Sequence, residues 1–253
     1  MIRIIFGKCE KCVAHNAADV VSEVIKNNPR ATLGLATGSS PIGMYRELIS
    51  RCKSGEISFA EVKSVNLDEY RGLGADHDQS YAYFMNENLF SHVDIKRENT
   101  HLPNGLAEDG DAECRRYDAV VESMGGVDIQ VLGIGNNGHI GFNEPASHFT
   151  KGTNLVSLAE STIDANSRFF ASRDLVPTEA FSMGIGQIMA AKRILLIAIG
   201  KGKADILEKA LFGEVTPAVP ASILQFASDV VVCADEAALS VIIEKHPQAV
   251  KIG

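Results

Sequence analysis

The sequence predicts an α/β fold with a single doubly wound, mostly parallel sheet and helices on both faces. Two observations carry this prediction. Short apolar, β-branched runs typical of buried strands recur at residues 3–6, 32–36, 62–67, 128–134, 193–199 and 229–234. Between them lie segments with apolar residues at helical period, such as 17–25 and 45–52. Because parallel strands need crossover connections, which are usually helical, this alternation indicates a parallel sheet.

Composition and charge restrict the class of protein. The chain has 253 residues, 45% of them hydrophobic, and no repeat or linker divides it, so we expect a single domain over residues 1–253. The formal net charge of −8 would repel nucleic acids and anionic membranes, so neither is an expected partner. No segment has transmembrane length or the pattern of a signal peptide, and a cytoplasmic protein is expected.

The cysteines and histidines give no metal signal. Five scattered cysteines, an odd number, argue against a disulfide framework and for a reducing compartment. Only Cys9 and Cys12 are closely spaced. Zinc would need a second pair of ligands, and a redox motif should open a helix after a strand. We therefore expect two unremarkable thiols in a loop that leads into a helix. The histidines lack paired spacing, so no metal is expected.

Residues 33–41, LGLATGSSP, have the pattern of an anion site. The pattern predicts a strand that turns into a helix beginning near Pro41 and ending near Gly55, with one of the two serines as its cap. Backbone N–H groups and the positive end of the helix dipole would then meet at one point. The donors would come from Thr37, Gly38, Ser39 and Ser40. An ordinary capped turn has the same pattern, and without a lysine the segment is no P-loop.

Two adjacent acids, Asp68 and Glu69, follow the strand predicted at 62–67. Successive side chains on an extended segment point in opposite directions, so only one of the two can easily face a given cleft. A carboxylate over a substrate carbon is a plausible proton carrier. A strand-end aspartate is also a common turn former, and the residues alone leave both interpretations open.

Gly133, Gly135 and Gly138 form a formal G-x-G-x-x-G, which is the pattern of dinucleotide-binding folds. Such a fingerprint should open a long helix on its third glycine. Gly141 and Pro145 follow too closely for that helix, so no cofactor is expected.

The same loop carries His139 between Asn137 and Glu144. Polar neighbours can fix the tautomer of an imidazole and tune its basicity. A lone histidine in a loop is usually surface decoration, whereas a strand end with two polar neighbours favours a functional role.

Five blocks of sequence, in order, resemble the glucosamine-6-phosphate deaminase family. They are LGLATGSSP at 33–41, NLDEYRGL with DQSYAYFM at 66–85, GIGNNGHIGFNEPAS at 133–147, ANSRFF at 165–170 and IGKGKA at 199–204. The resemblance implies a modified Rossmann-like fold and an enzyme that needs no cofactor. It also implies an aldose-ketose isomerase/deaminase that converts glucosamine 6-phosphate and water to fructose 6-phosphate and ammonia in N-acetylglucosamine catabolism.

The resemblance also implies roles for single residues. Asp68 matches the base that moves a proton from C2 to C1, and His139 matches the group that opens the pyranose ring. Asn137 and Glu144 match the polar partners of this histidine. The matches to the phosphate site are Thr37, Gly38, Ser39, Ser40, Arg168 and Lys203.

Two departures from the family pattern concern regulation and the histidine. Asn137 stands where the best-known members carry Asp. Asn154 and Val156 stand where allosteric members place cations for N-acetylglucosamine 6-phosphate, so little activation by that ligand is expected. The assembly, monomer or homo-oligomer, stays open.

Three alternatives remain beside the deaminase. An enzyme for galactosamine 6-phosphate would use the same phosphate loop, base and histidine. A 6-phosphogluconolactonase needs no proton removed from C2, and its relatives favour Arg where this chain has Tyr70. A sugar-phosphate sensor for gene regulation would normally bring a basic DNA-binding module, and none is present in the sequence.

Overall fold

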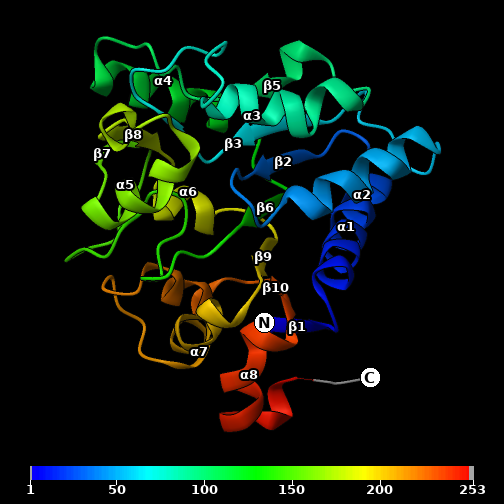
Figure 1. The fold of residues 1–253 in the computed structure, drawn as a ribbon. Coiled ribbons are helices and arrows are strands. Elements are labelled where there is room, and N and C mark those ends of the chain that lie inside the picture. The colour runs from blue at the N-terminus through cyan, green and yellow to red at the C-terminus, as the bar shows by residue number, and fades with distance from the viewer. Residues whose placement is uncertain (1, 251–253) are drawn as a thin grey trace.

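A computed structural model of the chain describes residues 2–250, apart from the side chains of residues 161 and 165. Its central sheet has seven strands in the order β1-β10-β9-β6-β2-β3-β5, and every neighbouring pair is parallel (Figure 1). All six strands expected from the sequence form, which confirms the α/β class. The strands are β1 Ile2–Gly7, β2 Thr32–Leu35, β3 Lys63–Asn66, β5 Thr100–His101, β6 Ile129–Leu132, β9 Ile194–Ala198 and β10 Val230–Asp235.

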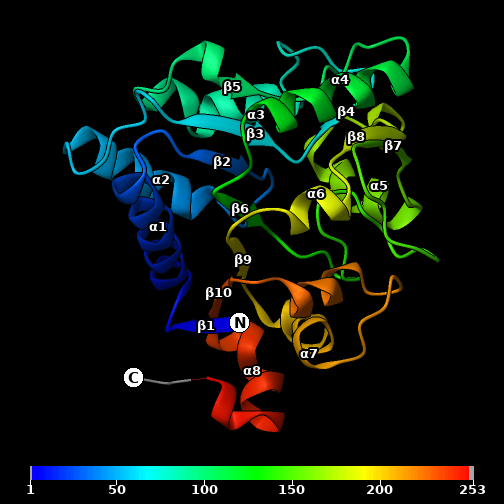
Figure 2. The ribbon, with the colours of Figure 1, turned by 180° about the vertical axis from the view of Figure 1, so that it is seen from behind.

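Helices cover the sheet on both sides. In both views α1 and α2 lie on one side of the sheet, and α5, α6 and α7 lie on the other (Figures 1 and 2). The α-helices of the described residues are α1 Glu10–Asn27, α2 Ile42–Lys53, α3 Tyr81–Asn88, α4 Gly110–Ser123, α5 Glu160–Asn166, α6 Ile185–Met189, α7 Ala204–Phe212 and α8 Glu236–Lys245. None of these helices combines the length and the apolar character needed to cross a membrane.

The core follows from the apolar runs. Every residue of β9 is buried, as expected for a central strand with helices on both faces. The apolar stripe of α1, including Val20, Val21 and Ile25, is buried against the sheet and α2. The hydrophobic core extends from α1 through the sheet to α8. The single domain over residues 1–253 stays a prediction.

A second, antiparallel sheet was not expected from the sequence. Its order is β4-β8-β7, with β4 at Asp68–Tyr70, β7 at Asn154–Ser157 and β8 at Glu179–Ser182. The chain leaves the central sheet after Asn66 and enters the small sheet at Asp68. The two acids therefore open a new strand rather than close the preceding one.

Strand order reverses between β2 and β6. From β2 the chain proceeds outward through β3 to β5, then returns to β6 beside β2 and proceeds outward through β9 to β10. Ligands of such sheets bind beyond the carboxyl ends of the strands at this reversal. The LGLATGSSP loop follows β2 and the glycine-rich histidine loop follows β6, so both lie at this point.

Candidate active site

A cavity of about 720 Å³ lies at the carboxyl ends of these strands. It brings together nine of the ten residues that the sequence singles out: Thr37, Gly38, Ser39, Ser40, Asp68, Asn137, His139, Arg168 and Lys203. The tenth, Glu144, lies behind the histidine and interacts with it. Residues spread over more than 160 positions of sequence thus share one site. The parallel strands β2, β3, β6 and β9 all end at the same edge of the sheet.

The LGLATGSSP segment at 33–41, called the phosphate loop below, has the free backbone donors expected of it. The prediction that a serine caps the following helix is wrong. Pro41 itself is the N-cap of α2, and no side chain caps the helix. Gly38 has φ of +88°, a conformation that favours glycine, and this turn aims the loop at the helix start. Since no serine occupies the first N–H groups of α2, a bound anion can accept from them.

Two cationic side chains face the loop across the cavity. Arg168 comes from the turn after α5, and its guanidinium carbon lies 4.6 Å from the ring centroid of Phe169. Lys203 comes from the segment after β9 and donates to Asn136 Oδ1 at 2.7 Å. Burial, and then repulsion by Arg168, lower the pKa of Lys203. In the described residues neither cation has an acidic partner, so the pair is suited to a dianionic ligand.

Asp68 is a buried carboxylate with no hydrogen-bond donor among the described residues, and it is 6% exposed. Burial, with a smaller contribution from the charge of Glu69, raises the pKa of Asp68 to about 8. A carboxylate of this kind is a stronger base than an exposed one and holds a proton away from water.

Glu69 points away from the cavity, in line with the expectation that only one of the two acids faces it. Its carboxylate accepts from the backbone N–H groups of Tyr70, Tyr81 and Ala82, each at 2.9 Å. Burial raises the pKa of Glu69 to about 7, although these three donors oppose the shift. Glu69 therefore ties the start of α3 to β4 and fixes the strand that carries Asp68.

The glycines of the histidine loop make room for the imidazole. A Cβ at Gly135 would lie 2.3 Å from Cε1 of His139, so only glycine leaves space for the ring there. Gly135 N–H also donates to the carbonyl of His139 at 2.9 Å, and Gly138 has φ of +89°. The formal G-x-G-x-x-G thus folds into a tight turn around a histidine and opens no long helix, as its spacing indicated.

Both residues expected beside His139 contact it, Glu144 at the ring and Asn137 at the backbone. The Nδ1 of His139 lies 3.4 Å from Oε2 of Glu144 and makes no hydrogen bond. The Oδ1 of Asn137 accepts from the backbone N–H of His139 at 3.2 Å and does not contact the ring. Its Nδ2 donates to Glu144 Oε2 at 2.6 Å. Asn137 therefore orients the carboxylate behind the ring, a contact that an ionised aspartate could not make.

Glu144 is held ionised. Burial alone would raise the pKa of Glu144, but interactions with His139, the Thr162 hydroxyl and Asn137 outweigh it and lower this pKa to about 2. Thr162 lies on α5 and donates to Oε1 of the carboxylate. A fixed negative charge behind Nδ1 favours the tautomer with a proton on that nitrogen, which leaves Nε2 free to accept one.

The histidine loop is also anchored beside Asp68. Phe142 N–H donates to Ser182 Oγ of β8 at 3.1 Å, and β8 pairs with β4. A Cβ at Gly141 would lie 3.6 Å from Asp68 Oδ2, so this turn packs closely against the carboxylate. The small sheet therefore brings the acid and the histidine to the same cavity.

Several further side chains of the cavity were missed at the level of sequence. Tyr81, Phe142, Thr162 and Asn166 all line it. Asn166 donates to the hydroxyl of Tyr70 at 2.8 Å, and Tyr81 and Phe142 stack at a centroid distance of 5.9 Å. Three of these residues, Tyr81, Phe142 and Asn166, belong to blocks that the resemblance covers, which is the signal that could have found them.

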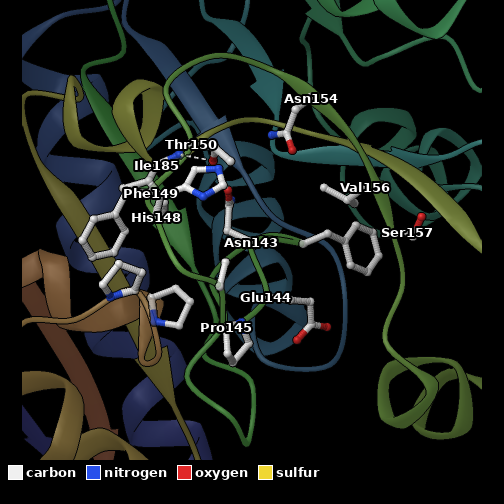
Figure 3. A pocket seen from close by; sticks show the side chains of 14 residues that line it. Asn143, Glu144, Pro145, His148, Phe149, Thr150, Asn154, Val156, Ser157 and Ile185 are labelled. Carbon is white, nitrogen blue, oxygen red and sulfur yellow. Dashed lines mark hydrogen bonds between the residues drawn. The ribbon is translucent and has the colours of Figure 1, made fainter.

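A second cavity, of about 250 Å³, is lined by Glu144 (Figure 3). Asn154 and Val156, which stand where allosteric members of the family carry cations, both line it, together with His148 and Thr150. No arginine or lysine is among its described lining residues. An anion in this cavity would therefore lack a counter-charge.

Comparisons with known proteins show which proteins the chain is similar to. The profile of the family described as glucosamine-6-phosphate isomerases/6-phosphogluconolactonase matches residues 8–233. A glucosamine-6-phosphate deaminase of Clostridium perfringens (strain SM101) is 52% identical over 93% of this chain and 97% of its own. One of Lachnoclostridium phytofermentans is 56% identical over 88% and 95%.

Solved structures show the same relationship. A monomeric glucosamine-6-phosphate deaminase superposes with a TM-score of 0.92 at 46% identity, over 94% of this chain and 99% of its own. A 6-phosphogluconolactonase from Thermotoga maritima, at 17% identity and a TM-score of 0.74, shares the fold; the match covers 93% of this chain and all of the other. Fold and site define an enzyme that acts on small sugar phosphates. Within that class, the chain belongs to the glucosamine-6-phosphate isomerase/6-phosphogluconolactonase family.

Proposed function

We propose that the chain converts glucosamine 6-phosphate and water to fructose 6-phosphate and ammonia. The observation that carries the proposal is the buried Asp68 carboxylate, which shares a cavity with an uncapped helix start and two cations. The deaminase relatives at about half identity over most of the chain support the same reaction. A lactonase would have no use for a strong base over a sugar carbon.

The residues have distinct roles in this proposal. Thr37, Gly38, Ser39 and Ser40, with Arg168 and Lys203, bind the phosphate and thereby fix the sugar. His139 shuttles a proton between the ring oxygen and the anomeric hydroxyl to open the ring, with Glu144 and Asn137 behind it. Asp68 then takes the C2 proton and returns it at C1, which gives an enolamine on the way to the ketose and free ammonia. Because the carboxylate is buried, the proton exchanges slowly with water.

The test is ammonia release coupled to detection of fructose 6-phosphate, with glucosamine 6-phosphate and galactosamine 6-phosphate assayed in parallel. The proposal expects turnover of the gluco substrate. Turnover of only the galacto epimer would keep the chemistry and change the substrate. Hydrolysis of 6-phosphogluconolactone without ammonia release from either amino sugar would overturn the proposal.

Loss of either cation should weaken substrate binding. Arg168→Met and Lys203→Met are each expected to raise KM by about 10- to 100-fold, since each removes one charge-assisted contact to phosphate. Steady-state kinetics measure this. Lys201→Met is the matched control, because Lys201 donates to Ser240 and does not line the cavity. An unchanged KM in both cavity variants would exclude the assigned phosphate site.

The second cavity leads to a regulatory prediction. N-acetylglucosamine 6-phosphate should change neither the half-saturating substrate concentration nor the shape of the rate curve, because Asn154 and Val156 bring no positive charge to that cavity. Initial rates with and without this ligand test the prediction. A sigmoidal rate curve that the ligand makes hyperbolic would contradict it.

The partners follow from the same proposal. The substrate is a small sugar phosphate, and no nucleic acid, membrane, metal or organic cofactor takes part. In the part of the chain that the structure describes, no cluster of three or more potential metal ligands is present. We infer a monomer, since the relative of 46% identity is a monomeric enzyme. We also infer a cytoplasmic protein, in line with the five scattered cysteines. Sedimentation equilibrium would measure the assembly.

A further inference from the structure

Cys9 and Cys12 have no part in the reaction proposed above. β1 ends at Gly7, α1 begins at Glu10, and Cys9 is the N-cap residue of this 18-residue helix. Cys12 lies in the first turn of α1. The expectation of two thiols in a loop that leads into a helix therefore holds for Cys9 and is wrong for Cys12. The structure gives the pair the placement that redox-active cysteine pairs require, directly after a strand and at the start of a helix.

The two thiols are in contact. Their sulfur atoms lie 2.8 Å apart, and both cysteines are free. A disulfide bond is about 2.05 Å long, so the two sulfur atoms need to approach by under about 1 Å to form one. The Sγ of Cys9 also accepts from the backbone N–H of Cys12 at 3.4 Å. Cys9 is exposed, whereas Cys12 is half-buried behind it.

Their surroundings make the two thiols unequal. The contact with the Cys12 thiol, and then the hydrogen bond from the Cys12 backbone N–H, lower the pKa of Cys9. The same thiol contact raises the pKa of Cys12. The exposed sulfur, which also accepts from a backbone N–H at the helix start, is therefore the one that ionises more readily. This is the arrangement of an attacking and a resolving cysteine.

The other cysteines have no such arrangement. Cys52 donates to Asp94 at 3.3 Å, and burial raises its pKa. Burial raises the pKa of Cys114 to about 11 and that of Cys233 to about 12. Neither is in contact with a second thiol in the described part of the chain. Oxidation should therefore be confined to one pair.

We propose that Cys9 and Cys12 form a reversible redox site that exchanges with low-molecular-weight disulfides. The Cys9 thiolate attacks one sulfur of the external disulfide, whose S–S bond breaks and releases one thiolate. Cys12 gives its proton to solvent and attacks Sγ of Cys9 in the mixed disulfide, expelling the second thiolate. Two protein thiols are oxidised to one disulfide, and the external disulfide is reduced to two thiols that take up protons.

The test treats the reduced full-length chain with oxidised glutathione and follows it by intact-mass measurement and peptide mapping. The wild type should lose two hydrogen atoms in mass, with an internal bond in the peptide that holds both cysteines, and dithiothreitol should reverse this. Cys12→Ser should instead trap one glutathionyl group on Cys9. Cys9→Ser, which keeps a residue suited to an N-cap, should react at least about tenfold more slowly at Cys12.

Cys52→Ser is the control for selectivity and should form the internal bond as fast as the wild type. Two outcomes would overturn the proposal. One is a wild type that accumulates a stable glutathione adduct without the internal bond. The other is a pair that reacts no faster than Cys52. Far-ultraviolet circular dichroism of each variant before treatment confirms that α1 has formed.

Discussion

Asp68→Asn is expected to abolish turnover while making the protein more stable at alkaline pH. As the base that carries the C2 proton, Asp68 should contribute about 10³-fold or more to kcat, and the amide cannot accept that proton. The loss should fall on kcat with a smaller effect on KM, because the phosphate site is intact. In the wild type, deuterium at C2 should appear partly at C1 of the product, since the buried carboxylate exchanges slowly with water.

The stability effect follows from the raised pKa. The pKa of Asp68 is about 8 in the folded protein against its ordinary value of 3.8, so the folded state retains a proton that the unfolded state has lost. Stability of the wild type therefore falls as pH rises from about 4 to 8. Asp68→Asn lacks this ionisation and should be more stable than the wild type at pH 9 by on the order of 3 kcal/mol.

Urea unfolding at pH 5 and pH 9 measures this difference, which should be small at pH 5 and large at pH 9. Asp111→Asn is the matched control, because Asp111 is exposed in the first turn of α4. It should change neither kcat nor the pH dependence of stability. Equal stability of Asp68→Asn and wild type at pH 9 would show that burial does not raise the pKa of Asp68.

Gly135→Ala is expected to lower kcat by about 10²-fold although it adds only one methyl group. The new Cβ would lie 2.3 Å from the imidazole of His139, and the ring must swing out of its place beside Glu144. Because a ring at the end of a side chain can move without the backbone, the free energy of unfolding should change by less than about 2 kcal/mol. Steady-state kinetics and urea unfolding together separate the two effects.

Two controls define the cause of that loss. Gly133→Ala adds the same methyl group two residues earlier, where it would meet Ser40 at an ordinary contact distance of 3.6 Å, and should cost far less activity. If the effect acts through the histidine, Gly135→Ala should cost nothing further in a His139→Ala background. Additive losses in the double variant would assign another role to Gly135.

The phosphate loop and the acids Asp68 and Glu69 show which features can be predicted from local sequence. The apolar runs predicted six of the seven strands of the central sheet but not the two-residue β5, and the spacing around Gly38 and Pro41 predicted the strand-turn-helix unit. Only the cap was wrong, because Pro41 takes the N-cap position and leaves the serines free. Period-two alternation also predicted that Asp68 and Glu69 would face opposite ways. These features depend on the covalent chain and its nearest neighbours.

The small antiparallel sheet shows where local sequence fails. Its strands have three or four residues each, and β4 pairs with β8 over a separation of more than 100 residues, so no periodic pattern predicts them. Yet this sheet carries Asp68 and anchors the histidine loop. The pairing of Asn137 with Glu144, and that of Thr162 with the same carboxylate, are likewise tertiary contacts.

The sequence by itself determined the α/β class, the main strands and the residue types that meet a phosphate and move a proton. Only the tertiary structure decided the pKa of Asp68, the partners of His139 and the contact between Cys9 and Cys12. The reason is physical: hydrophobic periodicity is encoded within a few residues, whereas burial and hydrogen bonding depend on which distant segments pack together.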